Sequence, residues 1–177
     1  MKPKLSPAEF AKRMANIKLL ALDVDGVLTD DALYIGPDNL EMKRFNISDG
    51  FFMVLAMRSG LQLAVVSGRY SPATDSRMRD LGVKHVLQGS SDKVGLITPL
   101  LTELKLGFEQ IAVVGNEILD IALAEKAGLS IGVADSAKEL IEVVDYVTGK
   151  PGGSGAVREV LEQYFIGTSQ DPRKFIR

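Results

Sequence analysis

The stretch LLALDVDGVLTDD, residues 19–31, indicates the fold and raises a chemical problem. An apolar run ends at Asp23, and a second carboxylate follows at Asp25. Such a run is typical of a strand that is covered on both faces, so the two acids stand at its carboxyl end. Crowding two negative charges there costs free energy. The stretch therefore predicts a cation or partner group that holds the carboxylates together.

Short apolar runs recur along the chain, and helix signals such as Ser71-Pro72 lie between them. Strand–helix alternation of this kind predicts a parallel sheet with right-handed crossovers. We therefore expect an α/β fold with three layers, Rossmann-like, around a central parallel sheet. The predicted strands are 19–24, 61–67, 83–88, 110–115 and 129–134, with 145–148 as a sixth strand at the edge.

Residues 32–47, ALYIGPDNLEMKRFNI, interrupt the alternation. Two β-like runs flank GPDN, a strong turn signal, so the segment reads as a β-hairpin flap directly after the first strand. It leaves no room for a cap domain. Around it we expect an N-terminal helix in residues 1–16, a single domain over 17–165 and a polar tail over 166–177. Ser6 and Glu9 form a capping-box pattern that starts the first helix.

The composition excludes several classes of protein. The 177 residues are 46% hydrophobic and 25% charged, with a net charge of −2, which is typical of a soluble globular domain. Dispersed charges give no footprint for nucleic acid or for a membrane surface. The chain has no cysteine, so disulfides, thiolate zinc sites and cysteine nucleophiles are excluded. No signal peptide or membrane-spanning run is visible, and we expect a cytoplasmic protein.

Polar residues follow four of the predicted strands, where ligands of open α/β sheets bind. Two carboxylates with oxygen ligands and retained water suit Mg²⁺. One carboxylate could attack a phosphoryl group, and the other could protonate the leaving oxygen and then activate water. A hydroxyl, backbone amides and a lysine could bind and neutralise the phosphoryl group. The residues are Asp23 and Asp25, then Ser67, Gly68 and Arg69, then Lys93, then Asn116, Glu117 and Asp120.

This arrangement resembles the haloacid dehalogenase superfamily of phosphohydrolases. The matching motifs are DVDGVLTD (23–30), VVSGR (65–69), Lys93 and GNEILD (115–120). Other stretches are similar to its small capless branch typified by 3-deoxy-D-manno-octulosonate 8-phosphate (KDO 8-phosphate) phosphatase. These are FNISDG (45–50), LQGSSDK (87–93), KAGLSIGVADS (126–136), DYVT (145–148) and GGSGAVREV (152–160). The similarity extends over about residues 17–162.

The resemblance implies a role for each site residue. Asp23 would be the nucleophile, which forms an aspartyl-phosphate, and Asp25 the general acid and base, with its backbone carbonyl on Mg²⁺. Ser67 would hold the phosphoryl group, together with Gly68 and Arg69, and Lys93 would bridge that group to the nucleophile. The family also implies a small phosphorylated sugar acid as substrate. It further implies a homotetramer whose central hairpins shape the active-site mouth of a neighbouring subunit.

The sequence departs from the family at the acidic loop. The family pattern is GDDxxD, so Asn116 stands where a metal-ligating aspartate is expected, and Glu117 or Asp120 could assist from a second position. The GNExxD variant also resembles the phosphatase-like domain of sialate cytidylyltransferases. A weak or inactive oligomerisation or regulatory module is therefore an alternative. So is a phosphatase for a related nonulosonate 9-phosphate, because Ser48, Phe52 and Ser154 replace family residues expected near the substrate.

Overall fold

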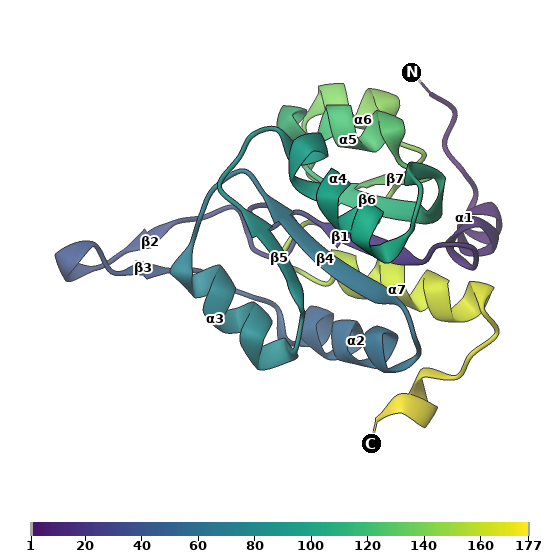
Figure 1. The fold of residues 1–177 in the computed structure, drawn as a ribbon, viewed down its shortest axis with the longest axis horizontal. Coiled ribbons are helices and arrows are strands. Elements are labelled where there is room, and N and C mark those ends of the chain that lie inside the picture. Colours follow the sequence, from purple (N-terminus) through teal and green to yellow (C-terminus); the bar gives the residue numbers. More distant parts are fainter. Residues whose placement is uncertain (1, 177) are drawn as a thin grey trace.

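A six-stranded parallel sheet forms the centre of the molecule in the computed structural model, which describes residues 2–176 (Figure 1). Its strands run in the order β5-β4-β1-β6-β7-β8. Their bounds are β1 Leu19–Leu22, β4 Gln62–Ser67, β5 His85–Gln88, β6 Ile111–Gly115, β7 Leu129–Gly132 and β8 Tyr146–Val147. All five pairings are parallel. The predicted α/β fold is confirmed, including the sixth strand at the edge.

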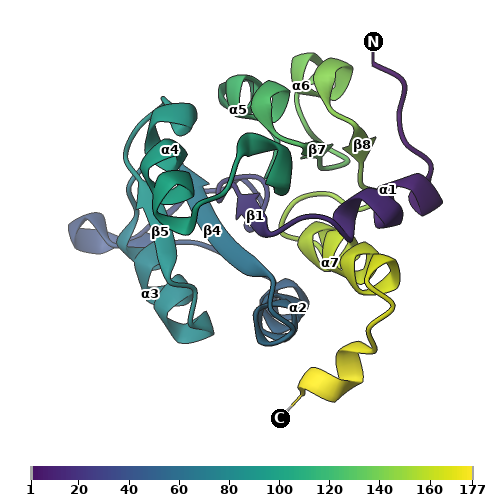
Figure 2. The same ribbon diagram turned by 45° about the vertical axis from the view of Figure 1, so that its right-hand side comes forward.

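Helices cover both faces of this sheet (Figures 1 and 2). One face carries α1 Pro7–Met14, α2 Ile47–Arg58, α3 Pro72–Leu81 and α7 Ala156–Gly167. The other face carries α4 Lys93–Leu104 and α5 Ile121–Lys126, with α6 Lys138–Val143 beside β7 and β8. Short 3₁₀ turns are η1 Pro37–Asn39, η2 Phe108–Gln110, η3 Ile118–Asp120 and η4 Pro172–Phe175. None of the helices described is long and apolar enough to cross a membrane.

Strand β1 shows why the central strands of this sheet are apolar at every position. Leu20 and Leu22 face the core under α1, α2 and α7, whereas Leu19 and Ala21 face the core under α4 and α5. Successive side chains of a strand point to opposite faces, so a central strand between two helical layers must be apolar at every position. The pairing with β6 continues past the strand end, because the Asp23 amide donates to the Val114 carbonyl at 3.0 Å. The backbone of Asp23 is thereby held against the sheet.

Both ends of the chain pack against the domain. The predicted capping box of α1 forms, with Ser6 and Glu9 exchanging hydrogen bonds, and Phe10 of α1 stacks on Tyr146 at 4.1 Å. At the other end, α7 continues to Gly167, beyond the predicted boundary at residue 165. The following η4 turn places Phe175 against the core. The flanking segments therefore extend the hydrophobic core.

The hairpin follows β1 as predicted and projects away from the sheet (Figure 1). Its strands are β2 Tyr34–Ile35 and β3 Glu41–Met42, which pair antiparallel. A bridge between Thr29 and Phe45 closes its base. No cap domain is present in residues 2–176, and the hairpin is the elaboration beside the carboxyl ends of the strands.

Asp145 ties the N-terminal segment to the sheet. One carboxylate oxygen accepts hydrogen bonds from the amide and hydroxyl of Ser130, both at 2.9 Å. The other pairs with Lys2 at 2.8 Å and Arg13 at 3.0 Å. Burial acts to raise the pKa of Asp145, but the hydrogen bonds from Lys2 and Ser130 and the charge of Arg13 outweigh it and hold the pKa below its ordinary value. The folded state therefore favours the ionised carboxylate.

We expect Asp145→Asn to lower the free energy of unfolding by about 1–3 kcal/mol at pH 7, because a buried charged acceptor is lost. A carboxyl whose pKa is lower in the folded state stabilises the protein above its unfolded pKa, and that contribution disappears as the pH falls through the folded pKa. The difference between wild type and variant in urea titrations should therefore shrink on acidification below about pH 4.

The matched control is Asp171→Asn, which breaks an ion pair with Arg173 whose arginine side chain is 84% exposed. Exposed pairs contribute less than about 1 kcal/mol, so this variant should differ little from wild type at any pH. Equal losses for the two variants would contradict the anchoring role of Asp145.

Candidate active site

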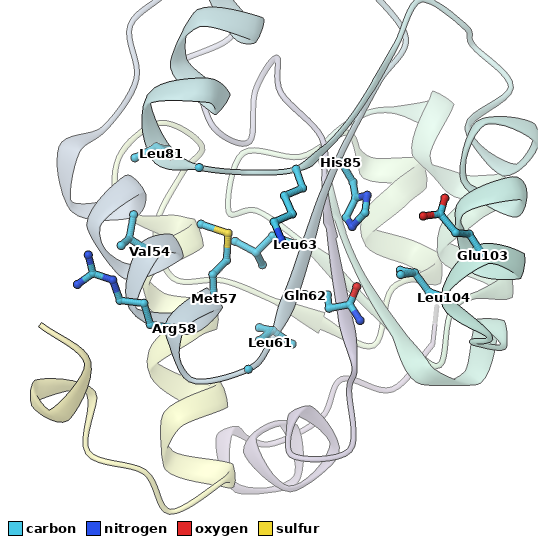
Figure 3. A pocket seen from close by; sticks show the side chains of 13 residues that line it. Val54, Met57, Arg58, Leu61, Gln62, Leu63, Leu81, His85, Glu103 and Leu104 are labelled. Atoms are coloured by element: carbon cyan, nitrogen blue, oxygen red, sulfur yellow. The ribbon is translucent and has the colours of Figure 1, made fainter. Parts of the chain in front are cut away.

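Two cavities are candidates for a functional site, and they lie at opposite ends of β4. The larger, about 710 Å³, is lined by Leu61, Gln62 and Leu63 at the start of the strand. Figure 3 shows α2 side chains on one side of it and the end of α4 on the other. The smaller, about 320 Å³, contains Ser67 at the end of the strand together with Asp23 and Lys93. Because ligands of parallel sheets bind at the carboxyl ends of strands, the smaller cavity is the candidate active site.

The loop after β1 is folded by its own residues. The Val24 carbonyl accepts hydrogen bonds from the amides of Val27, Leu28 and Thr29 and from the Thr29 hydroxyl. Gly26 has φ +80°, and a Cβ there would overlap the side chain of Asn116. Glycine is therefore required at this position by both its backbone angle and its close contact. This tight turn begins at Val24, between Asp23 at the strand end and Asp25 in the loop.

Lys93 is the central cation of the site. It stands at the first position of α4, behind the N-cap Asp92, and its side chain is only 4% exposed. Its Nζ lies 2.7 Å from Asp23 Oδ1 and 2.5 Å from Asp120 Oδ1. Burial acts to lower the pKa of Lys93, but the two carboxylates raise it above its ordinary value. Lys93 is therefore charged, and it holds a nucleophile candidate in place.

The environment of Asp23 is unusual for a carboxylate. Burial and the neighbouring charge of Asp120 raise the pKa of Asp23 to about 7, although Lys93 opposes the shift. A carboxyl group in a cavity whose pKa is shifted this strongly is a typical feature of a functional site. A cation at the free oxygen of Asp23 would reverse the shift, because a positive charge favours the ionised form.

Asp120 is a possible metal ligand by its place in the GNEILD motif, but in the structure its carboxylate accepts hydrogen bonds from protein groups. Its Oδ1 accepts from Lys93, and its Oδ2 accepts from the amides of Asn116 and Glu117 at 2.9 and 3.1 Å. Both oxygens are thus occupied, and the residue holds Lys93 and the acidic loop. Glu117 is exposed, and its own carboxylate accepts from the Ile118 amide at 3.0 Å. Glu117 nevertheless lines the same cavity as Asp23.

Asn116 fits the position of a cation ligand. It is 7% exposed and lines the cavity, yet its buried Oδ1 accepts no hydrogen bond from any residue described. An unpaired buried acceptor costs free energy unless a ligand or ion satisfies it. In residues 2–176 no cluster of three carboxylates or histidines could hold a metal alone. A cation would therefore combine the Asp23 carboxylate and the Asp25 backbone carbonyl of the first loop with the neutral oxygen of Asn116.

The second loop also enters the cavity, through Ser67, Gly68 and Arg69. Ser67 is 2% exposed, and its hydroxyl donates to the Arg69 carbonyl at 3.1 Å. The Arg69 guanidinium lies 2.6 Å from Glu41 of the hairpin and 3.9 Å from Asp25. All the residues predicted for phosphate binding are therefore at the cavity, although Arg69 is engaged by a hairpin carboxylate.

Some residues at the site were not identified from the sequence. Asp31 and Ser91 line the cavity, and Lys43 of the hairpin pairs with Asp25 at 2.5 Å. The sequence EMKRF already indicated this contact of the hairpin with the site, because charged Glu41 and Lys43 alternate there with Met42. Alternation of this kind indicates that the charged side chains share one face of the strand.

The three departures expected near the substrate do not line this cavity. Phe52 is in the core between α2 and α7, where its ring lies 6.3 Å from Phe165. Ser48 belongs to the exposed first turn of α2, and Ser154 is exposed in the glycine loop before α7. Within one subunit Phe52 therefore packs two helices together and does not line the cavity, and its effect on specificity stays a prediction.

Comparisons with known proteins agree with this geometry. A family model of haloacid dehalogenase-like hydrolases matches residues 81–161. The chain is 41% identical over 155 residues to the 3-deoxy-D-manno-octulosonate 8-phosphate phosphatase KdsC of Escherichia coli (strain K12), covering 88% of this chain and 82% of the relative. It is 43% identical over 147 residues to the enzyme of the same name from Salmonella typhi, covering 83% and 78%.

Solved structures show the same fold. The phosphatase of this name from Moraxella catarrhalis, in complex with a magnesium ion, a phosphate ion and KDO, superposes with a TM-score of 0.88 at 34% identity, covering 91% of this chain and 92% of that one. The cobalt-bound enzyme from Haemophilus influenzae gives 0.85 at 33% identity, covering 89% and 92%. With its fold, its strand-end motifs and these relatives in agreement, the chain belongs to the KDO 8-phosphate phosphatase family of haloacid dehalogenase-like hydrolases.

Proposed function

We propose that this protein is a Mg²⁺-dependent phosphatase that hydrolyses KDO 8-phosphate through an aspartyl-phosphate on Asp23. One observation carries the proposal: Asp23 is buried beside Lys93 in a cavity that also presents Ser67 and the unpaired oxygen of Asn116. A nucleophile, a fixed cation, a hydroxyl and a free acceptor in one cavity are the groups that phosphoryl transfer requires. The relatives described above are phosphatases of KDO 8-phosphate, and we take the substrate from them.

In the first half of the reaction, an oxygen of Asp23 attacks phosphorus and the bond from phosphorus to the sugar oxygen breaks. The electron pair stays on the sugar oxygen, which takes a proton from the carboxyl of Asp25. Lys93 and the loop of Ser67 to Arg69 counter the negative charge that spreads over the phosphoryl oxygens. The free sugar acid leaves.

In the second half, water attacks phosphorus of the aspartyl-phosphate. Asp25, now ionised, removes a proton from that water, and the bond to Asp23 breaks so that its electron pair returns to the carboxylate. Inorganic phosphate leaves, and both acids regain their starting states. The two acids, which are two positions apart, thus have different roles.

The divalent cation would be held by the Asp23 carboxylate, the Asp25 backbone carbonyl and the side-chain oxygen of Asn116. When bound, it supplies positive charge that offsets the repulsion between the carboxylates and the phosphate. Asn116 contributes a dipole instead of a full charge, so the total negative charge of the ligands is one unit lower than with an aspartate. Glu117 and Asp120 act outside this set, since their oxygens accept hydrogen bonds from the loop and from Lys93.

We also propose that the hairpins assemble four subunits into a homotetramer. The hairpin of each subunit exposes large apolar side chains, namely Leu33, Tyr34, Ile35, Leu40 and Met42. Ile47 and Phe51 at the base extend the same kind of surface, with Ile47 81% exposed. Clustered apolar surface of this kind is typical of an interface, and a hairpin of two short strands has little stability alone.

The nucleophile is tested by Asp23→Asn. Loss of the attacking oxygen should reduce Mg²⁺-dependent phosphate release from KDO 8-phosphate and from p-nitrophenyl phosphate by at least about 10³-fold. The fold should survive, because Lys93 keeps its contact with Asp120. Circular dichroism melts of the variant provide the control. Phosphate release at the wild-type rate would contradict the mechanism, and absence of turnover in the wild type would favour the regulatory alternative.

The metal site is tested by Asn116→Asp. A carboxylate in a partly dry cavity attracts a divalent cation more strongly than an amide does, so calorimetry should show Mg²⁺ binding about tenfold tighter, ~1.4 kcal/mol. Glu117→Gln is the matched control and should leave the affinity unchanged. If Glu117→Gln weakens binding and Asn116→Asp does not strengthen it, Glu117 is the ligand and our assignment is wrong.

The tetramer is tested by Ile35→Asp in the hairpin. A charge at a buried apolar contact is costly, so light scattering at micromolar concentration should show a tetramer for wild type and smaller species for the variant. Ile166→Asp is the matched control, since Ile166 of α7 is equally exposed, 63% against 62% for Ile35. A monomeric wild type would contradict the proposal.

A further inference from the structure

Strand β3 of the hairpin and the residue that follows it direct two charged side chains at the active site. Glu41 and Lys43 are two positions apart, so they share one face, and both make contacts with loops at the carboxyl ends of the sheet strands. Met42 between them is 50% exposed. The hairpin therefore has a charged face toward the catalytic loops and an apolar face toward solvent.

Lys43 makes the contact closest to the chemistry. Its Nζ lies 2.5 Å from Asp25 Oδ1, and its side chain has no exposed surface. Asp25 is 29% exposed and lines the cavity. The lysine thus approaches Asp25 from the protein side and leaves the second carboxylate oxygen, Oδ2, free of a close partner. The nearest cation to Oδ2 is Arg69, whose Nε is 3.9 Å away.

Glu41 fixes the strand that carries the lysine. Its two oxygens accept from the Arg69 guanidinium and the Ser71 hydroxyl, each at 2.6 Å. Ser71 is fully buried at the N-cap of α3, so this end of the contact cannot move far. The hairpin strand is therefore pinned to the rigid end of β4 and α3 on one side and to the first catalytic loop on the other.

We propose that Lys43 is a positioning residue for proton transfer. Lys43 binds one carboxylate oxygen of Asp25 and thereby directs the other oxygen toward the leaving group. This inference rests on the proposed function of Asp25. When Asp25 gives its proton to the sugar oxygen, the carboxylate that forms is already paired with a fixed cation, so the charge created in this step is stabilised.

The leaving group provides a selective test. A sugar alkoxide must be protonated as it departs, whereas p-nitrophenolate is stable without a proton. In single-turnover reactions with excess enzyme and Mg²⁺, Lys43→Met should slow release of KDO from KDO 8-phosphate by about tenfold or more, and release of p-nitrophenol by less than about threefold. Methionine preserves the length of the buried side chain and removes its charge.

A double-variant cycle identifies the partner. Asp25→Asn should show the same selectivity for leaving group, and adding Lys43→Met to it should cause no more than about a twofold further loss, because the lysine acts through the carboxylate. Arg44→Met is the matched control, since Arg44 is the next hairpin residue and pairs with Asp30 outside the cavity. It should leave both rates unchanged.

Each outcome supports or contradicts the inference. Equal losses for both esters in Lys43→Met, or a rise only in the enzyme concentration that gives half the maximal rate, would mean that Lys43 binds substrate or maintains the fold. Either result would overturn the inference while the proposed function stands. A wild-type enzyme that hydrolyses neither ester would contradict the proposed function and the inference together.

Discussion

The site depends on one buried lysine between two carboxylates. Lys93 begins α4, Asp23 directly follows β1, and Asp120 lies in the turn after β6, so one ion-pair network joins three segments that are far apart in sequence. Burying these charges is favourable only while all of them are paired, because removal of one partner leaves an uncompensated charge in a dry environment. The acidic loop adds to this network through backbone amides that donate to Asp120. Asp23, the proposed nucleophile, is thereby positioned by the same contacts that stabilise its surroundings.

Close backbone packing supports this network from the other side. A Cβ on Gly152 would overlap the carbonyl of Gly26, so the glycine loop before α7 lies directly against the catalytic loop. Asp49 of α2 holds the start of α7, accepting from the amides of Gly155 and Arg158 at 3.3 and 2.7 Å. Negative charge at a helix N-terminus is favourable. The FNISDG and GGSGA motifs are therefore supports of the active-site loop.

The hairpin connects assembly with chemistry. Its charged face contacts Asp25 and Arg69, and its apolar face is exposed. If subunits associate through the apolar face, the position of Lys43 becomes more rigid without any change in the catalytic loops, because ordering the strand orders both of its faces.

The sequence by itself determined the α/β class, the strands and the polar residues at their carboxyl ends, because apolar periodicity and helix caps are local properties of the chain. It also identified Asp23, Asp25, Ser67 and Lys93 as one constellation. Only the tertiary structure decided which atoms meet. The partners of Asp120, the burial of Phe52 between two helices and the reach of Lys43 to Asp25 all depend on the packing of segments that no local pattern relates. The unpaired oxygen of Asn116 became visible only when its neighbours in space, and not in sequence, were known.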